Sequence, residues 1–151
     1  MEQEKLNDIL AAHLQHAKLR GTKFYRANLE WCDLEGADLH KASFHEAYLL
    51  EAKLMRANLG AADLSNAYLV RANLGGAFMH LAYLGSADLK DANLCWTYLH
   101  KAEHLTIAQL SGTLTLYRAQ LDGELLESLD QDHPHLLEEP DWLSDRVHEE
   151  F

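Results

Sequence analysis

Large apolar side chains recur at every fifth position of the chain between residues 14 and 99, eighteen in all. Fifteen of them are Leu, and the others are Phe24, Phe44 and Met79. The residue two positions before each is Ala in fifteen cases and otherwise Thr22, Cys32 or Thr97. A helix would spread this stripe around its circumference, and a strand would send alternate large residues to opposite faces. The pattern therefore predicts a turn in every repeat and a coil that stacks on itself with Leu and Ala inside.

The repeats resemble the A-(D/N)-L-x-x motif of pentapeptide-repeat proteins. The clearest copies are Ala27-Asn28-Leu29, Ala37-Asp38-Leu39, Ala57-Asn58-Leu59, Ala62-Asp63-Leu64, Ala72-Asn73-Leu74, Ala87-Asp88-Leu89 and Ala92-Asn93-Leu94. The resemblance implies an all-β solenoid, a right-handed quadrilateral β-helix with four pentads per coil. The open ends of such a coil need covering, so we expect short helical caps at both ends. Eighteen pentads then make 4.5 coils, a rod roughly 22 Å long at the usual strand spacing.

The pattern divides the chain into four parts. We expect an N-terminal helical cap over 1–16, the repeat coil over 17–103, capping helices over 104–130 and an acidic segment over 131–151. Thr106 and Gln109 fit a capping box, and Asp122 is placed to cap a helix that carries Leu125, Leu126 and Leu129. The acidic segment either packs on the end of the rod or serves as a detachable partner-binding tail.

The net charge of −11 is unevenly distributed. Residues 12–101 hold nine acidic and ten basic side chains, whereas residues 102–151 hold twelve acidic and two basic ones. No basic stripe suggests direct binding of nucleic acid, and no apolar run approaches the ~18 residues of a membrane span. Residues 1–13 lack the features of a signal peptide, so we expect a cytoplasmic protein.

Residues twenty apart should stack on one outer face of such a coil. Tyr48 would lie over Tyr68 and Leu50 over Val70, and a neighbouring face would carry Phe78 over Tyr98. Contiguous exposed apolar groups often mark an interface. We therefore take these six residues as the candidate interaction surface. The alternative is that the rings only stabilise the coil, by about 0.5–1 kcal/mol per pair.

The histidines, the cysteines and the remaining aromatic pair give weaker evidence for a functional site. His40, His80 and His100 share an outward column with Gly60 between them, and we expect no carboxylate nearby, so the column is interpreted as solvated surface and no metal site is assigned. Cys32 stands at an inward position and should be inert, whereas Cys95 should point outward. Phe24 and Phe44 should stack inside the rod.

No catalytic motif is present in the sequence, and a rod filled with Leu leaves no interior pocket. The sequence therefore predicts a non-enzymatic module without cofactors, acting in protein–protein interaction or as a structural scaffold. It would bind an unknown protein partner as a monomer or dimer. The alternative implied by the resemblance is a DNA gyrase-directed mimic of duplex DNA, which a short, near-neutral rod disfavours.

Overall fold

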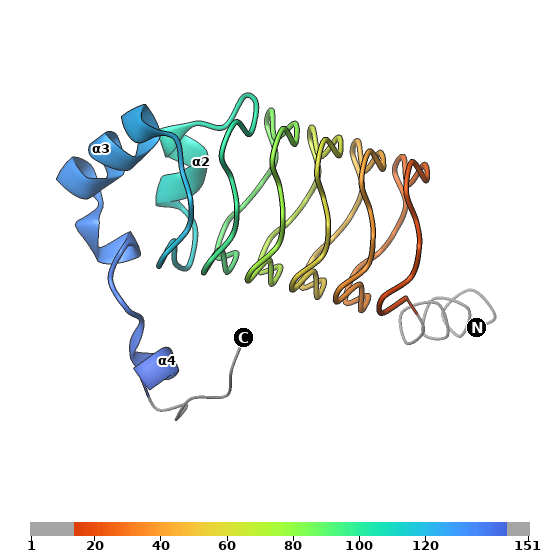
Figure 1. Ribbon diagram of the computed structural model, residues 1–151, viewed down its shortest axis with the longest axis horizontal. Helices are drawn as coiled ribbons and strands as arrows, with labels where there is room; N and C mark the ends of the chain where they lie inside the picture. The colour runs from red at the N-terminus through yellow and green to blue at the C-terminus, as the bar shows by residue number, and fades with distance from the viewer. Residues whose placement is uncertain (1–13, 145–151) are drawn as a thin grey trace.

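The repeats form a stack of coils, with helices gathered at its C-terminal end (Figure 1). This computed structural model describes residues 14–144. The N-terminal helical cap expected over 1–16 lies almost entirely outside them, and Leu14 already begins the first turn of the coil.

Each repeat contains one tight turn. The N–H of the inward Ala donates to the C=O of the preceding inward Leu, as from Ala57 to Leu54 at 3.1 Å. The third residue of all eighteen such turns has a φ between +52° and +67°, and only three of these residues are glycine. A positive φ at this place is what a type II turn requires. The predicted turn in every repeat is therefore confirmed.

Backbone hydrogen bonds join successive coils. In the repeat around Leu59, Asn58 N–H donates to Ala37 of the preceding coil, while Leu59 and Ala61 donate to Phe78 and His80 of the next, all at 2.7–2.9 Å. Parallel bridges pair residues twenty apart, from Lys18 with Asp38 to Tyr83 with Glu103. Four turns in twenty residues give each coil four sides. Each side has one isolated bridge, and between residues 14 and 144 no longer strand forms.

The axis of the coil is filled by the two inward columns. The large residues from Leu34 to Leu99 and the Ala residues from 37 to 92 are almost wholly buried. Phe24 and Phe44 stack inside, with ring centroids 4.8 Å apart, as predicted. Burial of so much apolar surface is the main force that holds the coils together.

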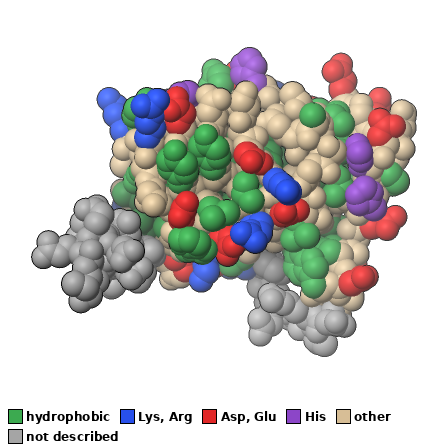
Figure 2. Space-filling view, turned by 180° about the vertical axis from the view of Figure 1, so that it is seen from behind, with side chains coloured by type: hydrophobic (Ala, Val, Ile, Leu, Met, Phe, Trp, Pro, Cys, Tyr) green, Lys and Arg blue, Asp and Glu red, His purple; other side chains and the backbone are tan. Residues whose placement is uncertain are grey.

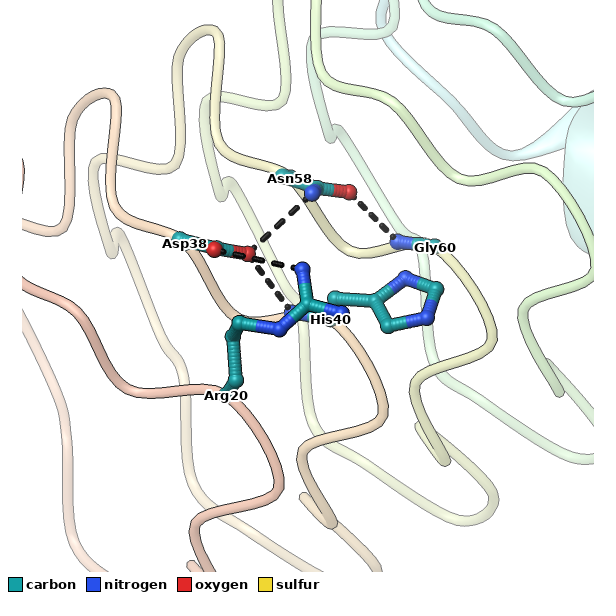
Figure 3. Close-up of polar contacts among 5 residues, drawn as sticks. All are labelled: Arg20, Asp38, His40, Asn58 and Gly60. Carbon is teal, nitrogen blue, oxygen red and sulfur yellow. Dashed lines mark hydrogen bonds and ion pairs between the residues drawn. The ribbon is translucent and has the colours of Figure 1, made fainter.

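The recurring Asp and Asn of the motif have a structural role (Figure 3). Asn58 Oδ1 accepts the N–H of Gly60, two residues on, and Asn58 Nδ2 donates to Asp38 Oδ1 of the preceding coil at 3.1 Å. The first contact is an Asx turn, which satisfies a backbone donor at the corner. The same contact recurs at Asp63, Asn73, Asp88 and Asn93. These side chains are therefore part of the turn and not a catalytic set.

Helix α2 (Ile107–Ser111) interrupts the coil, and the bridges then resume with a spacing of twenty-two, as between Asn93 and Thr115. The predicted capping box is confirmed: Thr106 and Gln109 bond reciprocally at its start. Gln109 Nε2 also donates to Leu84 and Ala87 C=O. The helix is thus tied to the edge of the coil beneath it.

Helix α3 (Gly123–Asp132) lies at the end of the stack (Figure 1) and buries Leu129. Asp122 occupies its N-cap position, but the side chain makes no capping bond. Its carboxylate instead accepts the N–H of Lys101 and lies 2.6 Å from His100 Nδ1. The prediction of a helix after Asp122 is confirmed, and the prediction that its side chain caps that helix is wrong.

The chain continues through the short 3₁₀ helix η1 (Pro134–Leu136) and α4 (Asp141–Ser144), which bury Leu136 and Leu143. Leu116 N–H donates to Leu136 C=O at 2.7 Å, joining this segment to the coil. Leu136 and Leu137 also pack against the core of the rod, so this part of the segment packs on the rod, whereas Val147 and Phe151 lie outside the described residues. None of the helices in the described part of the chain has the length and apolar character needed to span a bilayer.

Both cysteines are buried and free. Burial raises the pKa of Cys32 to about 12 and also raises the pKa of Cys95. The outward position predicted for Cys95 is wrong, because its thiol turns under the next coil and lies 3.8 Å from Thr115 Oγ1. The coil that resumes after α2 covers this corner.

Adjacent alanines test the turn geometry. Ala61→Gly should raise the free energy of unfolding, because the φ of +52° at Ala61 costs an L residue about 1–2 kcal/mol. The greater flexibility of glycine in the unfolded chain offsets about 0.4–1 kcal/mol of this gain. Ala62→Gly should lower it by about 1 kcal/mol, because Ala62 is buried in the core. Urea unfolding measures both, and a change of the same sign in the two variants would contradict this turn.

The cysteines should be unreactive in the folded protein. A thiol reagent at about pH 8 should label neither Cys32 nor Cys95 until guanidinium unfolds the chain, because both thiols are buried and protonated. Ser86→Cys, at an exposed corner, is the matched control and should add one rapidly labelled thiol. Rapid labelling of the native chain without this substitution would show that the packing around Cys32 or Cys95 opens.

Candidate interaction surface

The Tyr48 face, defined by Tyr48, Leu50, Tyr68 and Val70, lies on one side of the coil. The two tyrosine rings are parallel, with centroids 5.0 Å apart and planes 3° apart. They are 45% and 47% exposed, and Leu50 and Val70 lie at the adjoining corner, where both are half-buried. The repeat turns the tyrosine rings outward, because Ala47 and Leu49 on either side of Tyr48 fill the axis. The structure therefore brings together these four predicted residues.

Ion pairs border this face on both sides. Arg71 lies 3.1 Å from Glu51 at one corner, and Arg26 pairs with Glu46 at the other. The hydrogen bond from Arg26 holds the pKa of Glu46 below its usual value and raises the pKa of Arg26. In the view of Figure 2, hydrophobic side chains lie exposed among acidic and basic ones. The face is thus apolar in the middle and charged at its edges.

Two further aromatic residues extend the surface toward the N-terminal coils. Trp31 is 59% exposed at the corner below Leu50 and Glu51. Tyr25 is exposed at the opposite corner, where its ring stacks on His45 and the guanidinium of Arg26 lies 4.9 Å from its centroid. Neither residue was predicted from the sequence, although the twenty-residue spacing places Trp31 under Glu51 and Tyr25 under His45, at the two corners that flank Tyr48.

Phe78 and Tyr98 form a second exposed column, with centroids 4.7 Å apart and planes 11° apart. The prediction that this column lies on a neighbouring face is wrong. Phe78 bridges to Asn58 and Tyr98, whereas Tyr68 bridges to Tyr48 and Asp88. Because Phe78 follows Tyr68 by two pentads, or half a coil, the two aromatic columns lie on opposite sides of the rod.

The histidine column does not act as one group. The His40 ring leans over Gly60, where an added Cβ would lie 2.9 Å from Nδ1. His80 Nδ1 bonds the C=O of His100 at 3.0 Å, and His100 pairs with Asp122. The expectation that no carboxylate lies nearby is therefore wrong. Within residues 14–144 no three His, Cys, Asp or Glu side chains are arranged to hold a metal ion.

An open groove of about 480 Å³ lies beside the Tyr48 face, between the coil and the C-terminal segment. Its lining residues are Arg71, Asn73, Asp91, Asn93, Leu114 and Trp142. The sequence did not predict the groove, because the groove depends on where Trp142 of the C-terminal segment packs beside the coil.

Comparison with known proteins identifies the repeat. The family model of pentapeptide repeats matches eight copies, over residues 22–60 and 62–100. No curated protein sequence matches the chain. Among solved structures, the pentapeptide repeat protein Rfr23 from the cyanobacterium Cyanothece 51142 is 32% identical, with a TM-score of 0.50 over 64% of this chain and 61% of that one. The chain thus spans about three fifths of that relative's length.

Two other structures are more distant in sequence. A pentapeptide repeat protein from the Arabidopsis thaliana thylakoid lumen is 22% identical, with a TM-score of 0.46 over 80% of this chain and 79% of that one. QnrB1, a plasmid-mediated fluoroquinolone resistance protein, is 18% identical, with a TM-score of 0.51 over 76% and 64%. At 18% identity, the similarity to QnrB1 shows only that the two chains share a fold. With eight matched repeats covering half of its residues, the chain belongs to the pentapeptide repeat family.

Proposed function

We propose that this chain is a non-enzymatic protein-interaction module built on a right-handed quadrilateral β-helix, and that it binds partners through its flat outer faces. The observation that carries the proposal is the exposed, parallel pair of rings at Tyr48 and Tyr68 on the Tyr48 face. The inward Leu and Ala and the Asp and Asn of the turns are needed for the coil to fold, whereas these outward rings are not needed to fill its axis.

The stacked rings suit binding on energetic grounds. Tyrosine and tryptophan are enriched among the residues that contribute most to protein interfaces. Each ring is held by its neighbour in the next coil, so little side-chain entropy remains to be lost on binding. The alternative interpretation is that the rings only stabilise the coil by stacking on each other. Rings with that role could equally be covered by other side chains, yet both tyrosines are about half exposed.

The packing of the rod supports a role without catalysis. Leu and Ala fill the axis of the coil, as in the fully buried pair Leu59 and Ala57. Small-molecule sites are usually concave and bury most of their ligand. The groove beside Trp142 is open to solvent, and no described group of metal-ligating side chains lines it.

The gyrase-directed alternative has no specific observation in its favour. The likeness to QnrB1 is one of fold, and residues 12–101 carry nine acidic against ten basic side chains. A mimic of duplex DNA needs a continuous negative field along its length. In a gyrase supercoiling assay we therefore expect no effect at micromolar protein, and inhibition or protection at that concentration would restore this alternative.

Capture of host proteins on the immobilised chain tests the proposal. Tyr48→Glu combined with Tyr68→Glu should release proteins that the unaltered chain retains, because two carboxylates cannot be buried in an apolar contact without a large desolvation cost. Quantitative mass spectrometry of the captured proteins measures the loss.

The opposite face supplies the matched control. Phe78→Glu combined with Tyr98→Glu makes the same chemical change on an equally regular column, and circular dichroism and urea unfolding verify that both variants fold. Proteins lost from one variant and kept by the other assign a face to each partner. If every captured protein stays bound to both variants, the outer aromatic faces are not the interaction surface.

A further inference from the structure

We infer that the partner of the Tyr48 face is a second copy of this chain, packed antiparallel about a twofold axis that passes between the coils of Tyr48 and Tyr68. This inference rests on the proposed function, since it names the occupant of the same surface. It follows from the order of the residues along each outer column.

A twofold axis that lies in the plane of the face, perpendicular to the rod, reverses the order of the coils but keeps each column facing itself. Tyr48 of one copy then meets Tyr68 of the other, and Leu50 meets Val70. Both contacts occur twice. The apolar centre of the face is therefore self-complementary, with a ring against a ring and an aliphatic side chain against an aliphatic side chain.

The same operation pairs opposite charges at the corner of the face. Glu51 of each copy faces Arg71 of the other, and Glu30 faces Lys90. Within one chain Arg71 already lies 3.1 Å from Glu51, so in the dimer the two pairs would form a closed network of four alternating charges. Such complementarity fixes the register of an interface more than it adds affinity.

The shape of the edge is complementary as well. Trp31 is the most exposed large hydrophobic residue described, at 59%, and the axis places it opposite Asp91 of the second copy. Asp91 lines the open groove of about 480 Å³ that Trp142 borders. A tryptophan side chain from one copy thus has a hollow to enter on the other. At the opposite corner Tyr25 faces Gly85, which offers no side chain to clash with the ring.

Other arrangements lack this agreement. A parallel pair, with its axis along the rod, would bring Glu46 of one copy toward Glu51 of the other, which is repulsive. Applied to the Phe78 and Tyr98 column, the antiparallel operation would set His80 against His100 and Leu81 against Lys101, with no opposite charges. Charge and shape therefore single out the antiparallel pairing on the Tyr48 face.

The size of the face sets the strength of the dimer. Four coils at about 4.8 Å each and a side about 10 Å wide give roughly 200 Å² per copy before the corners are added. Stable dimers generally bury more than about 1,200 Å² in total. We therefore expect a weak, concentration-dependent dimer.

Sedimentation of the purified chain over an ~100-fold concentration range tests the inference. The unaltered chain should shift from monomer toward dimer. Glu51→Lys and Arg71→Glu should each weaken self-association at least about tenfold, because each sets two pairs of like charges across the interface.

An equimolar mixture of the two variants should restore dimers. The lysine introduced in one variant then faces the glutamate introduced in the other, while the unaltered Arg71 of the first still faces the unaltered Glu51 of the second. Neither variant can regain its own intrachain ion pair, so this recovery reports contact between copies.

Arg20→Glu is the matched control, because it reverses an arginine paired with Asp38 at the diagonally opposite corner, and it should leave the dimer unchanged. A chain that stays monomeric throughout, or a dimer that the mixture fails to restore, would overturn the antiparallel pairing. Heterologous proteins captured through the Tyr48 face by a monomeric chain would leave the proposed function standing. A dimer that survives Tyr48→Glu with Tyr68→Glu would place self-association elsewhere on the rod and overturn the inference.

Discussion

The left-handed backbone conformation of one residue in every five is the constraint on which the coil depends. Fifteen of the eighteen turns place a residue with a side chain there, in a conformation that L residues rarely adopt. What holds it is the adjacent coil: the N–H of Ala61, for example, donates to His80 nineteen residues later. Each corner is therefore stabilised by the next coil, and a coil without a successor would leave such donors unpaired. Helices α2 and α3 cover the last coils at the C-terminal end of the rod.

The same dependence explains where the regular spacing fails. After Glu103 the chain forms α2 in place of one side, and the bridges move from a spacing of twenty to twenty-two. The extra length pairs Thr115 with Asn93, so that its hydroxyl reaches the Cys95 thiol, and it brings Asp122 beside His100. Both contacts depend on the shifted register after α2, and they connect the last regular coil to its cap.

Much of this structure could be predicted from the sequence, because Leu and Ala at a fixed spacing leave one way to bury both. The turns, the Phe24 and Phe44 stack and the capping box at Thr106 followed from local pattern. The errors at Cys95 and Asp122 arose because the surroundings of each residue are set by distant parts of the chain. Cys95 is buried by a coil that returns only after α2, and the Asp122 carboxylate prefers the backbone of Lys101 to its own helix. Trp31 was overlooked because its corner position varies freely from repeat to repeat, so no pattern marked it.

A solid axis means that any specific recognition must be encoded in the outer columns, where residues twenty apart act as neighbours. In this chain the Tyr48 face and the Phe78 column lie half a coil apart and point in opposite directions. A twofold pair formed through the Tyr48 face would cover that face in both copies and leave two Phe78 columns outward, on opposite sides of the dimer. Such an assembly would bind a partner twice, and the two sites would raise the effective affinity for a repeated or dimeric target without any new contact. Self-association through one face and recognition through the other would then be separate properties of one rod, each altered by substitutions that leave the other intact.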